Sequence, residues 1–415
     1  MEVKLIMKSA RNAVIEIADG GIYNTKETYH VLLNGEEVFS TDTVINSLFD
    51  LKPQTSYEVS VRTAGGTELG TVSFVTAYEF VTLNVRDFGA TGDGKQDDTK
   101  FIQAAILACP KESRVLIPKG SYRITSLFLK SNLRLELAKG AELIADTDRA
   151  AYPKFPGMIE SYDEQGEYNL GTWEGNPLPM FAGIITGLDV ENVLIYGRGT
   201  INGNASKENW WKNPKVMVGA FRPRLFFLSH CQNVTLCGVT FKNSPSWTLH
   251  PYFSDNLKFY GLTINNPSDS PNTDGLDPES CKNVDIVGVK FSLGDDCIAV
   301  KSGKIYMGKK YKTPSENIHI RQCLMENGHG AVTVGSEMAG GVRNLHASKC
   351  IFKNTDRGLR IKTRRGRGKD ATIEGICFED IQMEDVRTPF VVNCFYNCCD
   401  PDCHSEYVKC KSPLP

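Results

Sequence analysis

The stretch Asn192-Val-Leu-Ile-Tyr-Gly197 decides the fold, because close variants of it recur along the chain. Each variant places an asparagine before alternating apolar residues, and the series starts at Asn192, Asn233, Asn256, Asn283, Asn317 and Asn344. Successive starts differ by 41, 23, 27, 34 and 27 residues. A sandwich or a propeller would show longer strands or a regular blade of about 40 residues. Short strands between Asn and Gly turns, without connecting helices, instead predict an all-β fold, a right-handed parallel β-helix over residues 81–415.

Residues 1–80 have a different pattern and predict a small β-sandwich in front of the β-helix. Apolar and polar residues alternate in Ala13–Ile17, and Asn34-Gly35 is a strong hairpin signal. The segment Leu51–Val61 resembles the late-strand signature of fibronectin type III domains. This resemblance implies that Tyr57 forms a tyrosine corner, with its hydroxyl bonded to the backbone. The unit is either a spacer or packing module, or a direct participant in substrate binding or subunit contact.

The composition is that of an ordinary soluble protein, with 23% charged residues and a formal net charge of −2. This balance excludes a general polyanion-binding surface, so any basic site must be local. No uncharged apolar run reaches the ~18 residues of a membrane span, and the first residues lack the apolar core of a secretory signal. We therefore expect a cytoplasmic protein without a membrane partner, or a secreted or periplasmic one if a signal has been removed.

The 13 cysteines lie mostly in apolar strand contexts, such as Cys237 and Cys377, which fits buried thiols in a reducing compartment. A cluster near the C-terminus lacks the Cys-x-x-Cys pairs of common zinc sites, so we expect free thiols and no metal there. The cluster consists of Cys394, Cys398, Cys399, Cys403 and Cys410. The coil pattern is still running where the sequence stops, which suggests a β-helix truncated at its C-terminal end.

Acidic and basic residues with the chemistry of a hydrolase occupy short turns in this coil background. Asp274, Asp295 and Asp296 lie between strand-forming segments, and Gly328-His329-Gly330 and Arg360-Ile-Lys362 follow them. An isolated Asp-Asp pair is commonly a turn or a helix cap. Here the steps from Asp274 to Asp296, to His329 and to Arg360 are 22, 33 and 31 residues, close to the repeat interval. Because residues one coil apart lie one strand spacing apart, ~4.8 Å, we expect these side chains to line one groove that suits a linear polymer.

These segments, together with Asn272-Thr-Asp274, match the four signature segments of the polygalacturonases, family 28 of the glycoside hydrolases. The resemblance runs from about Val85 to the end of the chain. It implies an inverting enzyme that hydrolyses α-1,4 bonds between galacturonate residues of pectin, without a cofactor. Such hydrolysis needs one carboxyl group that protonates the leaving oxygen and another that activates water.

Carried over position by position, the resemblance implies a role for each residue. Asp295 is the general acid, whereas Asp274 and Asp296 hold and deprotonate the attacking water. His329 lies near the acid and helps to keep its proton available. The further residues implied in substrate binding are Asn272, Arg360, Lys362 and Tyr396.

Six cations fall within the ten residues that start at Arg360, and Arg364 and Arg365 are among them. Such a run is a solvated loop, a nucleic-acid patch or a carboxylate-binding site. A nucleic-acid site would recruit interleaved aromatic residues and a basic overall charge, and both are missing. Arginine binds a carboxylate through two parallel hydrogen bonds. We therefore assign Arg364 and Arg365 to uronate recognition and expect no nucleic-acid partner.

Residues 146–180 form a long segment with little strand pattern and several aromatic residues, and loops of this length usually have a function. Together with the basic loop after Lys362, this segment is predicted to close one end of the groove. A closed end favours an exo-acting enzyme that releases galacturonate from chain ends. The alternatives are an endo-polygalacturonase, a rhamnogalacturonan hydrolase, a calcium-dependent pectate lyase and a non-catalytic solenoid that binds acidic polysaccharides. The sequence leaves the oligomeric state open.

Overall fold

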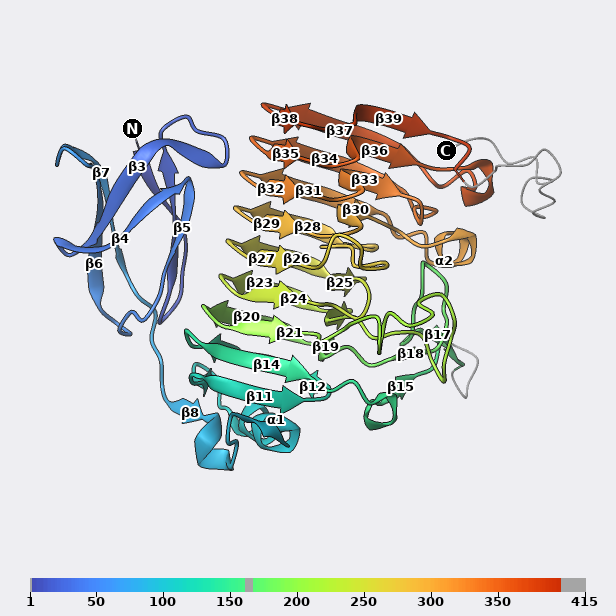
Figure 1. The fold of residues 1–415 in the computed structure, drawn as a ribbon, viewed down its shortest axis with the longest axis horizontal. Coiled ribbons are helices and arrows are strands. Elements are labelled where there is room, and N and C mark those ends of the chain that lie inside the picture. Colours follow the sequence, from blue (N-terminus) through green and yellow to red (C-terminus); the bar gives the residue numbers. More distant parts are fainter. Residues whose placement is uncertain (1, 161–166, 397–415) are drawn as a thin grey trace.

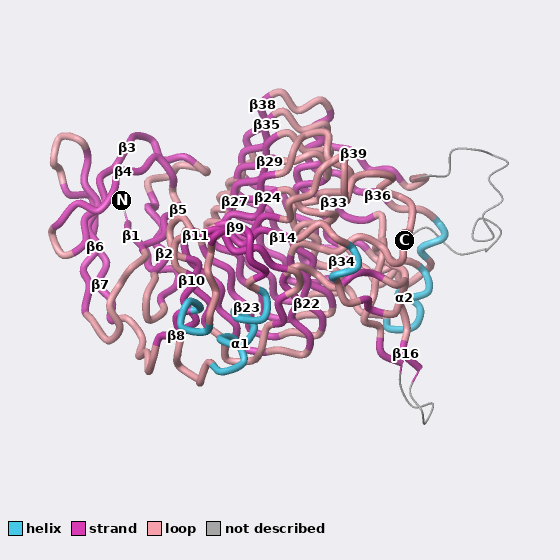
Figure 2. The backbone as a smooth tube through the Cα atoms, turned by 60° about the horizontal axis from the view of Figure 1, so that its bottom comes forward, coloured by secondary structure: helices cyan, strands magenta, loops and turns pink. Residues whose placement is uncertain are grey.

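The computed structural model describes residues 2–160 and 167–396. In this part of the chain, parallel sheets wind into a right-handed β-helix whose coils stack along one axis (Figure 1). Figure 2 shows that strands dominate the backbone, with the helices α1 (Thr99–Ala108) and α2 (Ile305–Tyr311) as short additions. The predicted fold class is confirmed.

Two of the sheets contain ten strands each, and we call them sheet I and sheet II. Sheet I contains β8 (Thr82–Asn84), β10 (Arg114–Ile117), β13 (Arg134–Leu137), β20 (Glu191–Gly197), β23 (Gln232–Cys237), β26 (Asp255–Tyr260), β28 (Lys282–Val287), β31 (Ser315–Arg321), β34 (Val342–Ser348) and β37 (Ile373–Glu379). Sheet II contains β9 (Asp93–Asp97), β11 (Gly120–Ile124), β14 (Ala141–Ala145), β21 (Thr200–Asn202), β24 (Thr240–Lys242), β27 (Thr263–Asn265), β29 (Lys290–Ser292), β32 (Leu324–Glu326), β35 (Ile351–Lys353) and β38 (Gln382–Glu384).

The third side of the coil, sheet III, consists of two groups of four strands. The first group is β12 (Leu127–Phe128), β19 (Ile185–Leu188), β22 (Phe226–Ser229) and β25 (Leu249–Tyr252), and the second is β30 (Asp296–Val300), β33 (Gly330–Gly335), β36 (Arg357–Lys362) and β39 (Thr388–Asn393). The coil between them adds no strand. Instead, Leu276 bridges Leu249 on one side and Ile298 on the other. This coil carries Asp274, so the interruption lies at the expected site.

The repeated asparagines explain why the coils stack in register. Each one adopts the left-handed backbone conformation, with φ of 58° at Asn192 and 55° at Asn233, which asparagine tolerates better than most residues. Their side chains form a ladder along the stack, in which Asn233 donates to Asn192 at 3.2 Å and Asn256 donates to Asn233 at 2.6 Å. A shift by one residue would break this ladder and turn the apolar residues that follow it away from the core.

The remaining elements are short. They are the 3₁₀ turns η1 (Val85–Phe88), η2 (Arg149–Ala151) and η3 (Arg365–Arg367), and the strand pairs β15 (Lys154–Phe155) with β18 (Met180–Phe181) and β16 (Ile159–Glu160) with β17 (Glu167–Tyr168). Both strand pairs belong to the long segment 146–180, which leaves the β-helix between sheet II and sheet III and returns to it at β19. Part of this segment, residues 161–166, lies outside the described residues.

The N-terminal unit contains two antiparallel sheets, as expected for a sandwich. One contains β1 (Glu2–Lys8), β2 (Ala13–Ala18) and β5 (Ile45–Leu48), and the other contains β3 (Asn24–Leu33), β4 (Glu36–Thr43), β6 (Ser56–Thr63) and β7 (Glu68–Val75). The Tyr57 hydroxyl accepts a hydrogen bond of 2.9 Å from the Lys52 backbone N–H, so the tyrosine corner is confirmed. Because β7 ends at Val75 and β8 begins at Thr82, we keep the division of the chain near residue 80 as a proposal.

The N-terminal unit packs on sheet I, whereas sheet III lies on the other side of the β-helix (Figure 1). An apolar cluster joins Ile45 of the unit to Tyr196 of β20. Beside it, Glu16 accepts hydrogen bonds of 2.9 Å from both Arg321 and Gln322. Apolar burial together with polar contacts fixes the unit against the β-helix.

The cysteines of the described residues behave mostly as buried apolar groups. Seven are free and buried, namely Cys109, Cys231, Cys237, Cys281, Cys297, Cys323 and Cys350. Cys377 is exposed, contrary to the expectation for it, and Cys394 is partly exposed. The other members of the C-terminal cluster, Cys398, Cys399, Cys403 and Cys410, lie outside the described residues. No helix in the described ranges is long and apolar enough to cross a membrane.

Candidate active site

The strand register of sheet III brings distant polar residues together. Asp296 begins β30, whereas Arg360 and Lys362 lie on β36, two strands further along the sheet. The strand between them, β33, places Gly330 opposite Asp296. A Cβ atom at Gly330 would lie 2.7 Å from Asp296 Oδ1. Because glycine has no Cβ atom, the side chains of Arg360 and Lys362 on β36 can reach across β33 to the Asp296 carboxylate.

Asp296 is bound by both of these cations. Lys362 Nζ lies 2.7 Å from Asp296 Oδ2, and Arg360 Nη1 lies 3.3 Å from Asp296 Oδ1. Although burial by itself raises the pKa of Asp296, the charges of Lys362 and Arg360 outweigh it and lower that pKa to about 2. Asp296 is therefore ionised at any ordinary pH and can act as a base.

Three carboxyl groups meet in this place. One oxygen each from Asp274, Asp295 and Asp296 lies within 4.8 Å of the others. This is closer than the ~6.5–9.5 Å that separates the carboxyl groups of typical inverting enzymes. A single water molecule, which makes hydrogen bonds of about 2.8 Å, can nevertheless bridge two oxygens at this spacing. The cluster is thus suited to holding one water molecule.

The environments of the three carboxyl groups differ. Burial and the neighbouring charge of Asp295 raise the pKa of Asp274 well above its usual range. The side chain of Asp274 is 5% exposed, whereas that of Asp295 is 21% exposed. His329 Nδ1 lies 3.4 Å from Asp295 Oδ1, and this contact raises the pKa of the imidazole. The cluster therefore holds an ionised base, a proton-retaining carboxyl group and a more accessible carboxyl group beside a histidine.

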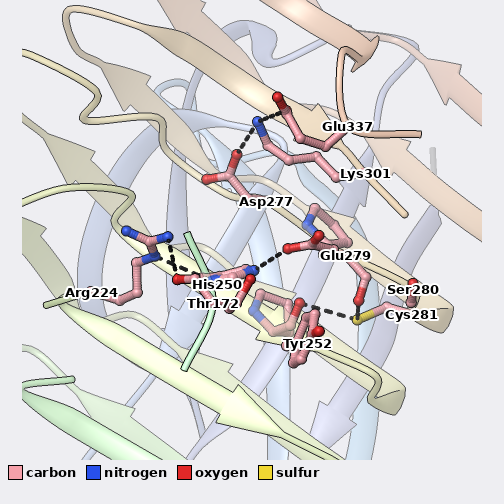
Figure 3. A network of polar contacts seen from close by, with 12 residues as sticks. Thr172, Arg224, His250, Tyr252, Asp277, Glu279, Ser280, Cys281, Lys301 and Glu337 are labelled. Carbon is pink, nitrogen blue, oxygen red and sulfur yellow. Dashed lines mark hydrogen bonds and ion pairs between the residues drawn. The ribbon is translucent and has the colours of Figure 1, made fainter. Parts of the chain in front are cut away.

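A buried cation that sequence reasoning missed lies under the cluster. Lys301 Nζ is 3.3 Å from Asp277 Oδ1 and 3.3 Å from Glu337 Oε2 (Figure 3). It is also 3.6 Å from Asp274 Oδ2. It also lies 4.0 Å from the ring centroid of Trp247. One feature could have revealed it. Lys301 directly follows the five buried residues of β30, and a lysine that continues a buried strand needs a partner of opposite charge.

A second polar layer lies below Lys301 (Figure 3). Arg224 Nε donates to His250 Nδ1 at 3.3 Å, and His250 Nε2 lies 2.8 Å from Glu279 Oε2. Since Nδ1 accepts, the proton of the neutral imidazole resides on Nε2 and is donated to Glu279. Burial lowers the pKa of His250 well below its usual range and raises the pKa of Glu279 to about 8. This layer supports the site from beneath.

The carboxyl groups open into a cleft of about 210 Å³. Its lining comprises Glu174, Lys215, Trp247, Asn272, Asp274, Asp295, Lys301, Ser336, Glu337, Lys362 and Tyr396. The long segment 146–180 supplies one wall, because the Gly175 carbonyl accepts a hydrogen bond of 2.9 Å from the Lys304 backbone N–H. A Cβ atom at Gly175 would lie 2.8 Å from the Glu337 side chain. Residues that are distant in the sequence therefore enclose the cleft.

Most of the predicted site residues meet here, and two do not. Asn272 accepts a hydrogen bond of 2.7 Å from Arg222, which fixes its amide at the cleft. The Tyr396 ring centroid lies 5.7 Å from the Arg360 guanidinium and 5.4 Å from Lys362 Nζ. Arg364 and Arg365 are not among the residues that line the cleft, and Arg365 is exposed. Their role in uronate binding stays a prediction.

Among residues 2–160 and 167–396, two groups of side chains could hold a metal ion by distance alone. One is the aspartate cluster, and the other is His346, Cys377 and Glu379 on the surface of sheet I. The aspartates already face Lys301, Lys362 and Arg360. These cations supply the positive charge that a hard metal ion would otherwise bring. The residues of the cleft are therefore suited to acid–base chemistry by carboxyl groups.

The fold and the site together define the class of the protein. A β-helix with three carboxyl groups and a pair of cations in one cleft has the catalytic groups of a glycoside hydrolase. Residues 162–410 match the family model described as glycosyl hydrolases family 28. Residues 82–139 match the model described as rhamnogalacturonase A/epimerase, pectate lyase-like. The chain belongs to family 28 of the glycosyl hydrolases.

Similar proteins agree with this assignment. The chain is 33% identical to a "Probable polygalacturonase" of Vitis vinifera, over 71% of this chain and 60% of that protein. It is 31% identical to an "Endo-polygalacturonase" of Pectobacterium carotovorum subsp. carotovorum, over 72% of each chain. The crystal structure of an exopolygalacturonase from Thermotoga maritima superposes with a TM-score of 0.62 at 29% identity, over 74% of this chain and 77% of that one. The chain spans about three fifths of the Vitis vinifera protein.

Proposed function

We propose that this protein hydrolyses α-1,4 bonds between galacturonate residues of pectin. The observation that supports this most directly is the meeting of Asp274, Asp295 and Asp296 within 4.8 Å, with Lys362 2.7 Å from Asp296. A base held ionised next to a second carboxyl group that can donate a proton is what acid–base cleavage of a glycosidic bond requires.

In the proposed reaction, a water molecule held between Asp274 and Asp296 attacks the anomeric carbon and gives its proton to Asp296. The bond from that carbon to the leaving oxygen breaks, and Asp295 protonates the oxygen. We assign proton donation to Asp295 because it is more exposed than Asp274, at 21% against 5%, and therefore reaches the substrate. His329 beside it returns a proton for the next cycle.

Recognition of uronate is assigned to the cationic side of the cleft. Arg360 is 16% exposed at its side chain and stands by the Tyr396 ring, so part of its guanidinium faces the substrate. Glu337 also lines the cleft, and its pKa is held well below the usual range because the charges of Lys301 and Arg367 outweigh its burial. An ionised carboxylate there repels a uronate group and accepts hydrogen bonds from sugar hydroxyls. The sugar is thereby oriented with its carboxylate towards Arg360.

We propose exo action because the long segment 146–180 closes one side of the cleft. Its Glu174 and Gly175 contact Lys304, with 3.6 Å between Glu174 Oε2 and Lys304 Nζ. A polymer that extends beyond the cleft on both sides would clash with this wall. The end of a chain can stop at the wall and therefore fits. An endo-acting enzyme is the alternative, and one of the relatives carries that name.

A time course of products from trigalacturonate and polygalacturonate tests the proposal. Saturated monogalacturonate or a single short product from the first minutes supports exo hydrolysis, whereas mixed mid-length products favour the endo alternative. An unsaturated product, lost on adding a chelator, would favour a lyase, and turnover only of rhamnose-containing chains would favour a rhamnogalacturonan hydrolase. Proton NMR of the first anomer released shows whether the reaction inverts.

The variant Asp295→Asn separates an enzyme from a non-catalytic binding solenoid. Turnover should fall by at least about 10²-fold, the usual contribution of a general acid, while oligogalacturonate still binds. Undiminished turnover would refute the role of Asp295.

The expected cytoplasmic location of the protein is not supported by the proteins to which the chain is similar.

A further inference from the structure

A second groove lies between the N-terminal unit and sheet I, and it shares no lining residue with the cleft. Its volume is about 730 Å³, against about 210 Å³ for the cleft. Residues 6–9 of the N-terminal unit form one wall, and residues of β13, β20, β23 and β26 form the floor. A volume of this size falls in the range of sites that bind small ligands, about 300–1,000 Å³.

The charge of this groove differs from that of the protein. Its lining holds the cations Lys8, Lys111, Arg134 and Lys258 and the single carboxylate Glu112, whereas the whole chain has a net charge of −2. None of the four cations lies within 4.0 Å of a carboxylate in the described ranges. The carboxylate next to Lys258 in strand register, Asp285, instead contacts His319 at 3.5 Å.

Several surface lysines elsewhere on the β-helix do have carboxylate partners. Lys282 pairs with Glu316 at 2.8 Å, Lys290 with Glu326 at 3.2 Å, and Lys353 with Glu384 at 3.4 Å. In each case a carboxylate on the next strand takes up the charge. The charges of the groove thus remain available for an anionic ligand, while Arg134 Nη1 also donates a hydrogen bond of 2.9 Å to the Tyr78 carbonyl.

The remaining lining suits a sugar better than an inorganic ion. Asn192, Asn233 and Thr235 offer amide and hydroxyl groups, while Leu194 and Met7 offer apolar surface for the C–H faces of a sugar ring. The contacts of Ile45 and Glu16 with the β-helix hold the two walls in place, so little ordering is needed on binding.

We propose that this interdomain groove is a second binding site for acidic oligosaccharides, separate from the cleft. The inference rests on the proposed function, because it takes the ligand to be the galacturonate polymer that the cleft cleaves. With sheet I and sheet III on different sides of the β-helix (Figure 1), a polymer held in the groove keeps other chain ends near the cleft. Such tethering raises the local substrate concentration and leaves the turnover of short substrates unchanged.

The test uses the full chain with Lys8→Gln, Arg134→Gln and Lys258→Gln combined, and Lys282→Gln, Lys290→Gln and Lys353→Gln as the matched control. Calorimetry with purified oligogalacturonate in the Asp295→Asn background should show two sites in the parent and control but one in the groove variant. In the active enzyme, the groove variant should raise the half-saturating concentration of polygalacturonate by about tenfold, with trigalacturonate turnover within twofold.

Equal weakening in the groove and control variants, or one site in all three proteins, would overturn the inference while leaving hydrolysis intact. Binding of double-stranded DNA that is stronger than binding of oligogalacturonate would also overturn it. If the parent failed to hydrolyse any galacturonate polymer, the proposed function would fail instead. Thermal unfolding of the groove variant checks that its fold is retained.

Discussion

Lys362 Nζ lies 2.7 Å from Asp296 Oδ2, although 66 residues separate the two in the sequence. Asp296 is fully buried, so its negative charge depends on this cation and on Arg360. The pair therefore combines a structural and a catalytic role, and removing one partner should affect both.

Replacing Lys362 by methionine should raise the pKa of Asp296 by about 1–3 units. In the parent, the low pKa keeps the base ionised until the pH falls through about 2. In Lys362→Met, the acidic limb of the kcat profile should move upward by a similar amount, and stability should fall by about 3–5 kcal/mol.

The control for this variant is Lys353→Met, which breaks an exposed pair with Glu384. It should leave the pH profile unchanged and alter stability by less than about 1 kcal/mol. A Lys362→Met enzyme with the acidic limb of the parent would show that Asp296 is not the base.

Lys301 should set the protonation of Asp274. Burial and Asp295 raise the pKa of Asp274, and the positive charge of Lys301 opposes them. In the proposed reaction Asp274 holds the water molecule while it retains its own proton. Lys301→Met should raise the pKa of Asp274 further, so this proton is lost at higher pH and the alkaline limb of the rate profile moves upward. Lys301→Arg, which retains the charge, should restore the limb in part. If both variants lose activity at every pH without a shift, Lys301 has only a packing role.

Glu279 should make the protein less stable at alkaline pH. Burial raises its pKa to about 8 from an ordinary value of 4.5. The folded protein thus binds a proton that the unfolded chain releases between these values. The associated stability is fully present below about 4.5 and is lost as the pH rises through about 8, by an amount on the order of a few kcal/mol.

The variant Glu279→Gln keeps a hydrogen-bond acceptor for His250 and removes this titration. The melting temperature of Glu279→Gln should match that of the parent at pH 5 and exceed it at pH 9. An equal decrease at both pH values would show that the carboxyl group contributes by its shape alone.

The wall of the cleft should depend on Gly175. This residue has φ of +72°, and a Cβ atom would lie 2.7 Å from the Lys304 backbone nitrogen. Gly175→Val should displace the wall and increase the share of mid-length products from polygalacturonate. Gly66→Val is the matched control, because Gly66 has φ of +83° and no atom within 4 Å of a built Cβ. An unchanged product pattern in Gly175→Val would argue against closure by this segment.

The repeat that begins at Asn192 was sufficient to predict the coil architecture, because the stacked asparagines and the alternating apolar residues act through neighbours one coil away. The same periodicity placed Asp274, Asp296 and Arg360 in one region. Their pKa order was not predictable, since the lowering at Asp296 depends on how far Lys362 reaches past Gly330.

The sequence by itself thus determined the fold, the tyrosine corner and the meeting of the three aspartates with Arg360 and Lys362 in one place. Tertiary structure alone decided that Lys301 is buried under Asp274, that Gly175 seals one wall against Lys304, and that the N-terminal unit leaves a cationic groove beside sheet I. Local periodicity fixes neighbours along the stack, because strand pairing repeats at a constant spacing. Loops and domains that meet from distant coils follow no such period, so their contacts exist only in the folded chain.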